Sequence, residues 1–153
     1  MIRERHENTL TSIIVPTLNQ WEYTRQCLDS IRAFTVTPYE LIVVDNGSTD
    51  ETVASLKQMK DVILIENDHN KGFPAACNQG LAIARGRQFL LLNNDVIVTH
   101  GWLEGLLDCL YADPAHGAVG PVSNSVSGVQ ARPQAYETIL KMRADLYLAI
   151  CAA

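Results

Sequence analysis

Three polar residues that could hold a metal ion, Asn93, Asn94 and Asp95, directly follow a short apolar run. The run, Phe89–Leu92, is too short for a helix and predicts a strand buried on both faces, as in a parallel sheet covered by helices. Ligands of open α/β sheets collect at the carboxyl ends of the strands. A carboxylate beside amide oxygens at such an end suits Mg²⁺ or Mn²⁺ bridged to phosphates. The alternative is an Asx-rich turn, in which these side chains bond only to nearby backbone.

Two further apolar runs, Ser12–Val15 and Leu41–Val44, also end in residues that could contact a ligand. The residues that follow them are Pro16, Thr17, Asn19, Asp45, Asn46 and Gly47. Because the carboxyl ends of parallel strands share one edge of a sheet, we expect these residues to converge with Asp95. Asp45 could accept a hydrogen bond from a base or a ribose, or it could be a structural Asx-turn residue.

The elements that must position these residues alternate along the chain. Apolar runs predict strands over Ser12–Val15, Leu41–Val44, Val62–Ile65, Phe89–Leu92 and Ala118–Val122. Helical spacing predicts helices over Trp21–Phe34, Thr52–Met59, Phe73–Arg85, Trp102–Tyr111 and Thr138–Ala153. Ser48 and Glu51 fit a capping box at the start of the second helix. The alternation predicts an α/β fold of three layers, α/β/α, with a mainly parallel sheet.

Composition and motifs exclude several classes of protein. The 153 residues suffice for one domain, and a net charge of −5 with scattered basic residues argues against a nucleic-acid binder. The four cysteines lie far apart and predict free thiols in a reducing compartment. The sequence has no signal peptide and no membrane span, so we expect a cytoplasmic protein that reaches the inner face of a membrane only through a partner or through a segment not present here. It also lacks the glycine motifs of dinucleotide dehydrogenases and P-loop NTPases.

Four segments together resemble family 2 glycosyltransferases of the GT-A fold, whose nucleotide-binding half is Rossmann-like. They are Ser-Ile-Ile-Val-Pro-Thr-Leu-Asn (12–19), Glu-Leu-Ile-Val-Val-Asp-Asn-Gly-Ser-Thr-Asp (40–50), Asn-Lys-Gly-Phe-Pro-Ala-Ala-Cys-Asn-Gln-Gly (70–80) and Leu-Leu-Leu-Asn-Asn-Asp-Val-Ile-Val (90–98). Each motif alone is modest, but four in this order make the resemblance specific. It extends from about Ser12 to Asn124.

The resemblance implies a transferase that binds a nucleoside-diphosphate sugar, linked to UDP, dTDP or GDP, and transfers the sugar to a glycan or lipid-linked acceptor in polysaccharide or cell-envelope biosynthesis. By this likeness the nucleotide sugar contacts Pro16, Thr17, Asn19, Asp45, Asn70, Gly72, Asn78, Asn93 and Asn94. Asp95 would carry the Mn²⁺ or Mg²⁺ on the diphosphate, where a metal offsets the charge of the leaving group.

Two positions depart from the family pattern. Asn93 replaces the first aspartate of the Asp-x-Asp motif, as in members that act on rhamnose and similar sugars, and leaves one fewer anionic ligand. Leu18 stands where an aromatic residue or histidine is common, so the resemblance assigns no stacking side chain there.

The resemblance also implies an inverting displacement that uses a carboxylate base from the later part of the domain. No acidic motif of that kind follows Gly128. We therefore expect residues 1–153 to be a single glycosyltransferase domain truncated at its C-terminal side, with the base beyond Ala153 and no transfer by this chain alone. The alternatives are a non-catalytic nucleotide-binding module and a nucleotidyltransferase. The latter would carry a glycine-rich basic loop where this chain has Pro-Thr-Leu-Asn-Gln.

Overall fold

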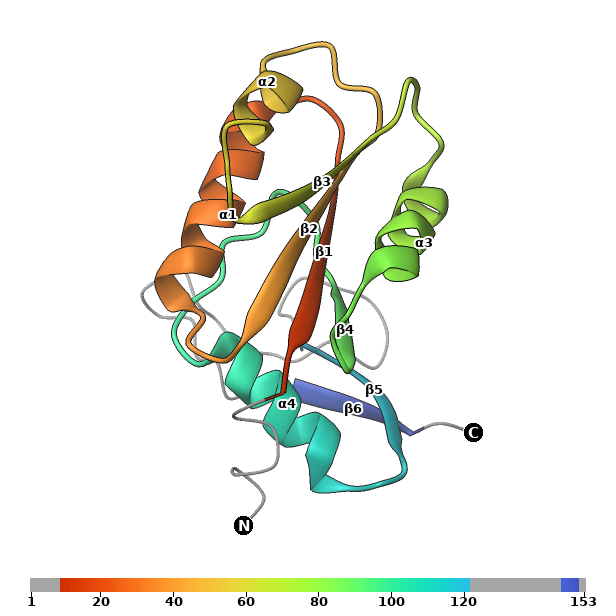
Figure 1. Cartoon of the computed structure of the whole chain (residues 1–153). Helices are drawn as coiled ribbons and strands as arrows, with labels where there is room; N and C mark the ends of the chain where they lie inside the picture. Colours follow the sequence, from red (N-terminus) through yellow and green to blue (C-terminus); the bar gives the residue numbers. More distant parts are fainter. Residues whose placement is uncertain (1–8, 122–146, 152–153) are drawn as a thin grey trace, which may run out of the picture. The chain divides into compact units, whose positions relative to one another are not determined.

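The computed structural model describes residues 9–121 and 147–151, which fall into two compact units, residues 9–98 and the described residues from 99 on (Figure 1). The strands of the first unit are β1 (Thr11–Thr17), β2 (Tyr39–Asp45), β3 (Val62–Glu66) and β4 (Gln88–Leu91). Its helices are α1 (Trp21–Phe34), α2 (Thr52–Leu56) and α3 (Phe73–Ile83). The second unit contains α4 (Trp102–Ala112), β5 (His116–Pro121) and β6 (Tyr147–Cys151).

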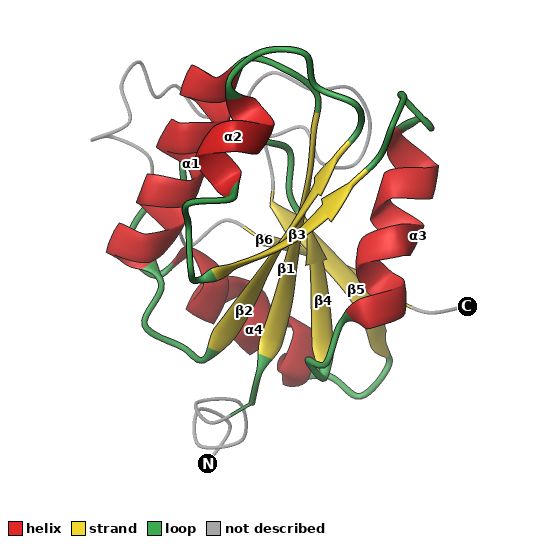
Figure 2. Cartoon of the chain, turned by 45° about the horizontal axis from the view of Figure 1, so that its top comes forward, coloured by secondary structure: helices red, strands yellow, loops and turns green. Residues whose placement is uncertain are grey.

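The first unit is a parallel sheet with the strand order β3-β2-β1-β4. Helices α1 and α2 lie on one side of this sheet and α3 lies on the other (Figures 1 and 2). This arrangement confirms the predicted three-layer α/β fold. It follows from the alternation of strands and helices, because a crossover helix must pack on a face of the sheet that its strands form.

The sheet core divides by the alternation of side chains along each strand. On the α3 side, Ile14, Ile42 and Val44 form a buried cluster with Ala76. The intervening residues of β1 and β2 are also fully buried and belong to the opposite face, where α1 contributes Cys27, Leu28 and Ile31 as buried residues. Gly80 lets α3 approach closely, since a Cβ atom there would lie 2.5 Å from Cγ2 of Ile14.

The order in which strands are added to the sheet reverses, so that β1 and β4 are neighbours at the point of reversal. The first two crossovers build outward from β1 to β2 and β3, whereas the third returns past both to place β4 on the free side of β1. Such a reversal opens a crevice at the carboxyl ends of the two strands, which is where open α/β sheets bind ligands. A ligand site of this unit is therefore expected among the residues that follow β1 and β4.

The expectation that the Phe89–Leu92 strand is buried on both faces is wrong. Phe89 and Leu91 of β4 are 55% and 49% exposed. The physical reason is the strand order, because β4 is an edge strand that pairs only with β1 among the described strands. A continuous apolar run indicates a strand, but it does not show whether both faces are covered.

In the second unit, β5 and β6 form an antiparallel pair, with Val119 opposite Ala149. The predicted strand near residue 118 is confirmed, but the predicted helix over Thr138–Ala153 is wrong at its end, because residues 147–151 form β6. An apolar run of this length fits a strand or a helix, and pairing with β5 decides between them. The rest of that predicted helix and the predicted loop at 123–133 lie outside the described residues.

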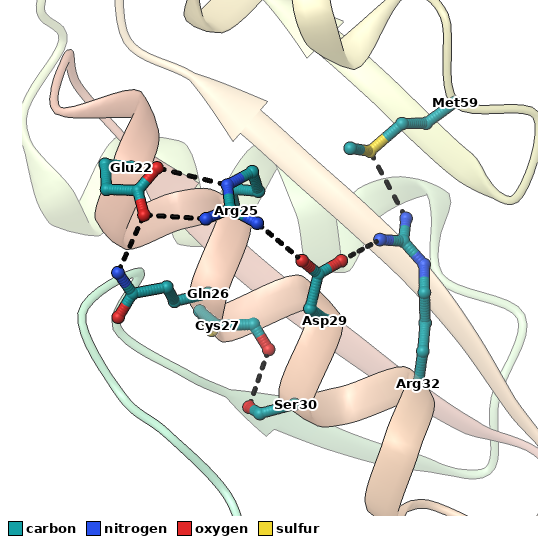
Figure 3. Close-up of polar contacts among 8 residues, drawn as sticks. All are labelled: Glu22, Arg25, Gln26, Cys27, Asp29, Ser30, Arg32 and Met59. Carbon is teal, nitrogen blue, oxygen red and sulfur yellow. Dashed lines mark hydrogen bonds and ion pairs between the residues drawn. The ribbon is translucent and has the colours of Figure 1, made fainter.

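The outer surface of α1 carries charges in alternation, as Figure 3 shows. Arg25 pairs with Glu22 at 2.7 Å and with Asp29 at 3.2 Å, and Arg32 pairs with Asp29 at 3.1 Å. The hydrogen bonds from Arg25 and Gln26 lower the pKa of Glu22 to about 2. This solvated ladder accounts for the polar face of an amphipathic helix and leaves the opposite face for the sheet.

The predicted capping box at α2 is wrong. The N-cap residue is Glu51, whose side chain makes no capping bond, and the first backbone N–H of the helix, that of Thr52, donates a hydrogen bond to Asp50 Oδ1 at 3.0 Å. Asp50 Oδ2 also accepts one from Trp21 N at 3.3 Å, at the first residue of α1. Ser48 Oγ accepts instead from the backbone of Asn19 at 2.7 Å, so it binds the neighbouring loop rather than its own helix.

Candidate functional site

A cavity of about 240 Å³ lies at the carboxyl ends of the strands of the first unit. It is smaller than the roughly 300–1,000 Å³ of pockets that enclose a whole drug-sized ligand, so it fits part of an extended ligand. Its lining combines apolar side chains with amides and one hydroxyl: Pro16, Thr17, Leu18, Asn46, Asn70, Phe73 and Asn94. The loops after β1, β2, β3 and β4 all contribute, as the convergence of parallel strand ends requires.

Asp45 closes β2 opposite Thr17 of β1 and is only 1% exposed. Its Oδ2 accepts hydrogen bonds from Gly47 N at 3.0 Å and Ser48 N at 2.9 Å, which is the structural Asx arrangement. Its Oδ1 is buried and has no hydrogen-bond partner among the described residues. Such an atom is costly to bury, and one explanation is an acceptor kept for a ligand. Asp45 lies beside the cavity lining rather than in it, because Asn46 is the residue of this loop that lines the cavity.

Asn19 joins the loops that follow β1 and β2. Its Oδ1 accepts hydrogen bonds from Thr49 N at 2.8 Å and from the Thr49 hydroxyl at 3.4 Å, and its own backbone N–H donates to Ser48. Asn19 and Gln20 have φ values of 55° and 58°, in the left-handed region that asparagine tolerates well. The structure thus gives Asn19 a loop-joining contact and does not place it in the cavity lining.

A network of amides fixes the loop between β3 and α3. Asn67 and Gln79 exchange two hydrogen bonds, each of 2.8 Å, and Asn67 Nδ2 also donates to Asn46 Oδ1 at 3.1 Å. Asn46 in turn donates to the carbonyl oxygen of Gly72 at 3.4 Å. Asn70 Oδ1 accepts from Gly72 N at 2.8 Å and shapes the turn before α3. The network holds the start of α3 against the end of β2.

Gly72 and Gly47 allow this packing of loops. Gly72 has a φ of 84° at the N-terminal end of α3, a conformation that other residues rarely adopt. Gly47 has a φ of 88°, and a Cβ atom there would lie 2.8 Å from the Cα atom of His69. Both glycines therefore allow backbone conformations, and at Gly47 a close backbone contact, that other residues would disfavour in the loops around the cavity.

The segment after β4 is attached to α1 by three side chains on one helical stripe. Thr24 Oγ1 accepts from Asn94 Nδ2 at 3.0 Å, Cys27 Sγ donates to the Asn93 carbonyl oxygen at 3.6 Å, and Ser30 Oγ accepts from Val98 N at 3.1 Å. The pKa of the Cys27 thiol is raised to about 11, mainly by burial. A hydrogen bond from the Val96 backbone lowers this pKa in part, and the charge of Asp95 contributes to raising it. Cys27 is therefore a neutral thiol with a structural role, and Cys27, Cys77 and Cys109 are all free, as predicted.

Asn94 also connects the ends of β1 and β4, because its Nδ2 donates to Thr17 Oγ1 at 3.2 Å. Thr17 Oγ1 lies 2.8 Å from Thr24 Oγ1, so one amide and two hydroxyls form a partly buried triangle at the switch point. Since Thr17 pairs with Asp45 on its other side, Asp45 and Asp95 belong to the same edge of the sheet. The predicted convergence of the strand ends is confirmed.

The Asp95 side chain follows this anchored amide and is exposed, with no ion pair to any residue that the structure describes. Within those residues, no group of three or more His, Cys, Asp or Glu side chains could hold a metal alone. One open carboxylate flanked by the amides of Asn93 and Asn94 fits a hard cation that takes its remaining oxygens from phosphates and water. The donor set therefore fits a shared metal and does not fit a closed structural one.

Asn78, by contrast, is exposed on α3 and is not among the cavity-lining residues. The family resemblance had implied that Asn78 contacts the nucleotide sugar. Alanine and glycine occupy the buried face of α3 there, and Asn78 lies off that face.

Four residues that the structure brings to this site were missed: Thr24, Asn67, Phe73 and Gln79. Thr24 could have been found as a polar residue on the apolar stripe of the first helix. Asn67 directly follows the third strand and so shares the edge of the other strand ends. Phe73 and Gln79 gave no comparable signal, because an aromatic at a helix start and an amide on a helix are common.

Comparisons with known proteins agree with this geometry. The profile of the family described as Glycosyl transferase family 2 matches residues 12–149. A PGL/p-HBAD biosynthesis glycosyltransferase of Mycobacterium bovis is 40% identical over 88 residues, which are 55% of this chain and 34% of the relative. An uncharacterized glycosyltransferase of Haemophilus influenzae is 31% identical over 115 residues, which are 72% of this chain and 36% of the relative.

A solved structure also resembles the chain, the mannosyltransferase PcManGT from Pyrobaculum calidifontis in complex with GDP-Man and Mn²⁺. The TM-score is 0.65 at 25% identity, and the match covers 76% of this chain and 36% of that protein. The chain thus spans about a third of the length of each of these relatives. None of the helices in the described residues is long and apolar enough to cross a membrane.

Proposed function

Because the chain belongs to glycosyl transferase family 2, we propose that it forms the donor-binding portion of an enzyme that transfers a sugar from a nucleoside diphosphate to an acceptor hydroxyl. The observation that carries the proposal is the convergence of Asp45, Thr17 and Asn94 beside a cavity, with the open carboxylate of Asp95 next in the chain. The solved relative that binds GDP-Man and Mn²⁺ supports this class of donor.

In this proposal two parts of the donor, the nucleoside and the diphosphate, bind on opposite sides of β1. The loops after β2 and β3 bind the nucleoside through Asn46 and Asn70, and Pro16 and Leu18 contact it from the end of β1. Asp45 lies beside this lining and would offer the nucleoside its Oδ1, which has no partner among the described residues. Asn94, fixed by Thr17 and Thr24, orients the segment that carries Asp95 toward the diphosphate. A Mn²⁺ or Mg²⁺ ion held by Asp95 would supply positive charge that stabilises the diphosphate as it leaves.

We further propose that transfer proceeds with inversion and that the residue deprotonating the acceptor lies outside the described residues. The acceptor in this proposal is a glycan or a lipid-linked molecule, and the donor sugar is a hexose or a rhamnose-like sugar. The product in this proposal belongs to polysaccharide or cell-envelope biosynthesis, and the mycobacterial relative, which is named for PGL/p-HBAD biosynthesis, supports a biosynthetic role.

Calorimetric titration of the chain with UDP, dTDP and GDP, with and without Mn²⁺, tests the proposal. At least one diphosphate is expected to bind, and Mn²⁺ is expected to strengthen its binding. Asp95→Ala should remove most of the Mn²⁺ effect. The matched control is Asp61→Ala, which removes an exposed carboxylate just before the amino end of β3, where it pairs with Arg32, and should leave binding unchanged.

Two outcomes would contradict the proposal. If no nucleoside diphosphate binds, the cavity is not a donor site. If a diphosphate binds equally well without Mn²⁺ and to Asp95→Ala, the site is that of a metal-independent nucleotide-binding module.

A further inference from the structure

Phe73 presents a large aromatic side chain to the cavity without any role assigned so far. It is the first residue of α3, is 50% exposed and is one of the residues that line the cavity. A half-exposed phenylalanine costs free energy unless a ligand or a partner covers it, because much of its apolar surface stays in water. Its position in the wall of a cavity rather than on an open face makes a ligand the natural cover.

The backbone before Phe73 is fixed more firmly than that of an ordinary loop. Gly72 has its N–H bonded to Asn70 Oδ1 and its carbonyl oxygen bonded to Asn46 Nδ2. Asn46 is itself held by Asn67, which is paired with Gln79 on the helix that Phe73 begins. The ring is therefore attached to a rigid frame, which lowers the entropy cost of ordering it against a ligand.

The sheet order says which part of a ligand the ring faces. The Asn46–Gly72 contact belongs to the β2 side of β1, whereas Asn94 and Asp95 follow β4 on the other side. A donor whose diphosphate lies at Asp95 therefore extends toward Phe73 with one of its ends. The sugar must remain open to the acceptor, so the end that suits a wall of Phe73, Leu18 and amides is the nucleobase.

The chemistry of the wall agrees with this assignment. Every nucleobase has a π face that packs on an aromatic ring and an edge of hydrogen-bond donors and acceptors. Amide side chains such as those of Asn46 and Asn70 can both donate and accept. A ring beside amides thus matches a flat heterocycle better than it matches a diphosphate.

From these contacts we infer that Phe73 is a base-contacting residue of the donor site, which supplies the aromatic surface that Leu18 does not. This inference rests on the proposed function and adds the residue that binds the base. Base–aromatic stacking of this kind changes affinity by about 5- to 150-fold when the ring is removed.

The test compares Phe73→Ala with Phe73→Trp and with Phe89→Ala in the 153-residue chain. Phe89 is the matched control, because it is 55% exposed on β4 and lies outside the cavity lining. The probes are UDP and GDP with Mn²⁺, and inorganic pyrophosphate with Mn²⁺. Phe73→Ala should weaken UDP or GDP at least fivefold and leave pyrophosphate unchanged, while Phe73→Trp and Phe89→Ala should bind as the wild type does.

The other results distinguish the two proposals. If the wild type binds UDP or GDP and Phe73→Ala binds them equally well, the inference is overturned and the proposed function stands. Equal weakening of pyrophosphate binding would show a general structural effect and would also overturn the inference. If the wild type binds no nucleotide, the proposed function itself fails.

Discussion

Asp45 offers the sharpest test of the site, because its two oxygens have different surroundings. Oδ2 accepts two backbone hydrogen bonds, whereas Oδ1 is buried and has no partner among the described residues. In Asp45→Asn the amide oxygen is expected to replace Oδ2, since the opposite orientation would set an NH₂ group against two N–H donors. The substitution therefore keeps the turn and replaces the free acceptor by a donor.

The expected effect on stability is small because two contributions oppose each other. The two backbone bonds change from charged to neutral, which costs about 1–1.5 kcal/mol for each bond. Removing a buried charged atom without a partner returns about 1–3 kcal/mol. Together these contributions range from a gain of about 1 kcal/mol to a loss of about 2 kcal/mol, so we expect the free energy of unfolding of the unliganded chain to fall by no more than about 2 kcal/mol.

Nucleotide binding should respond strongly to the same change. A ligand N–H or O–H that binds Oδ1 loses a hydrogen bond to a charged acceptor, which is worth about 1.5–3 kcal/mol. This corresponds to a decrease in affinity of about 10- to 150-fold. Urea unfolding measures the first quantity and calorimetry with UDP and GDP in Mn²⁺ measures the second.

Asp50→Asn is the matched control, since both oxygens of Asp50 already accept backbone N–H groups. An asparagine at position 50 must place its NH₂ group against one of these two backbone N–H groups, so Asp50→Asn should lose stability. Its nucleotide affinity should stay unchanged, which is the reverse of the result expected for Asp45→Asn. The reasoning fails if Asp45→Asn binds the nucleotides within twofold of the wild type. A large loss of stability in Asp45→Asn would mean that both oxygens are structural.

Two further predictions concern residues around the site and the opposite end of the sheet. Thr24→Val removes one of the two hydroxyls that hold Asn94, and the lost hydrogen bond is worth about 0.5–1.5 kcal/mol. The substitution should lower the Mn²⁺-dependent part of UDP or GDP affinity by about 2- to 10-fold. An unchanged Mn²⁺ dependence in calorimetry would show that this contact does not position the segment that carries Asp95. Burial of Glu40 disfavours its charged form, but the hydrogen bonds from Ser12 and Arg85 outweigh this effect, so the pKa of Glu40 is lowered from 4.5. The stability that this carboxylate contributes is fully present above pH 4.5 and is lost as the pH falls through the lowered pKa. Urea midpoints between pH 7 and pH 3 should therefore fall less steeply for Glu40→Gln than for the wild type. Parallel curves for the two proteins would contradict a stabilising role of the Glu40 carboxylate.

The sequence predicted the strand ends well because each is marked by a local change. Apolar runs that stop at Asp45 or at Asn93 show where a strand leaves the core, and the alternation of strands and helices brings those ends to one edge. Most predicted strands match β1 to β5 closely. The roles proposed for the individual site residues stay predictions, because they concern a ligand that only binding experiments can test.

The errors of prediction have a common cause, which is that the deciding partner is distant in the chain. The burial of Phe89 depends on whether another strand covers β4, and the state of residues 147–151 depends on pairing with β5. The first N–H of α2 bonds to Asp50 and not to Ser48, because Ser48 Oγ bonds to Asn19, in a loop 29 residues earlier. No window of local sequence contains these contacts.

The sequence by itself determined the order of strands and helices, the family, and which side chains stand at the strand ends, because periodicity and turn residues act over a few neighbouring positions. Only the tertiary structure decided that Asn94 bonds to Thr17 and Thr24, 77 and 70 residues away, and that one oxygen of Asp45 has no partner among the described residues. It also decided that Phe73 faces the cavity while Asn78 does not. Such contacts depend on how the packed helices and strands bring distant atoms within hydrogen-bond distance, and a linear pattern does not record that distance.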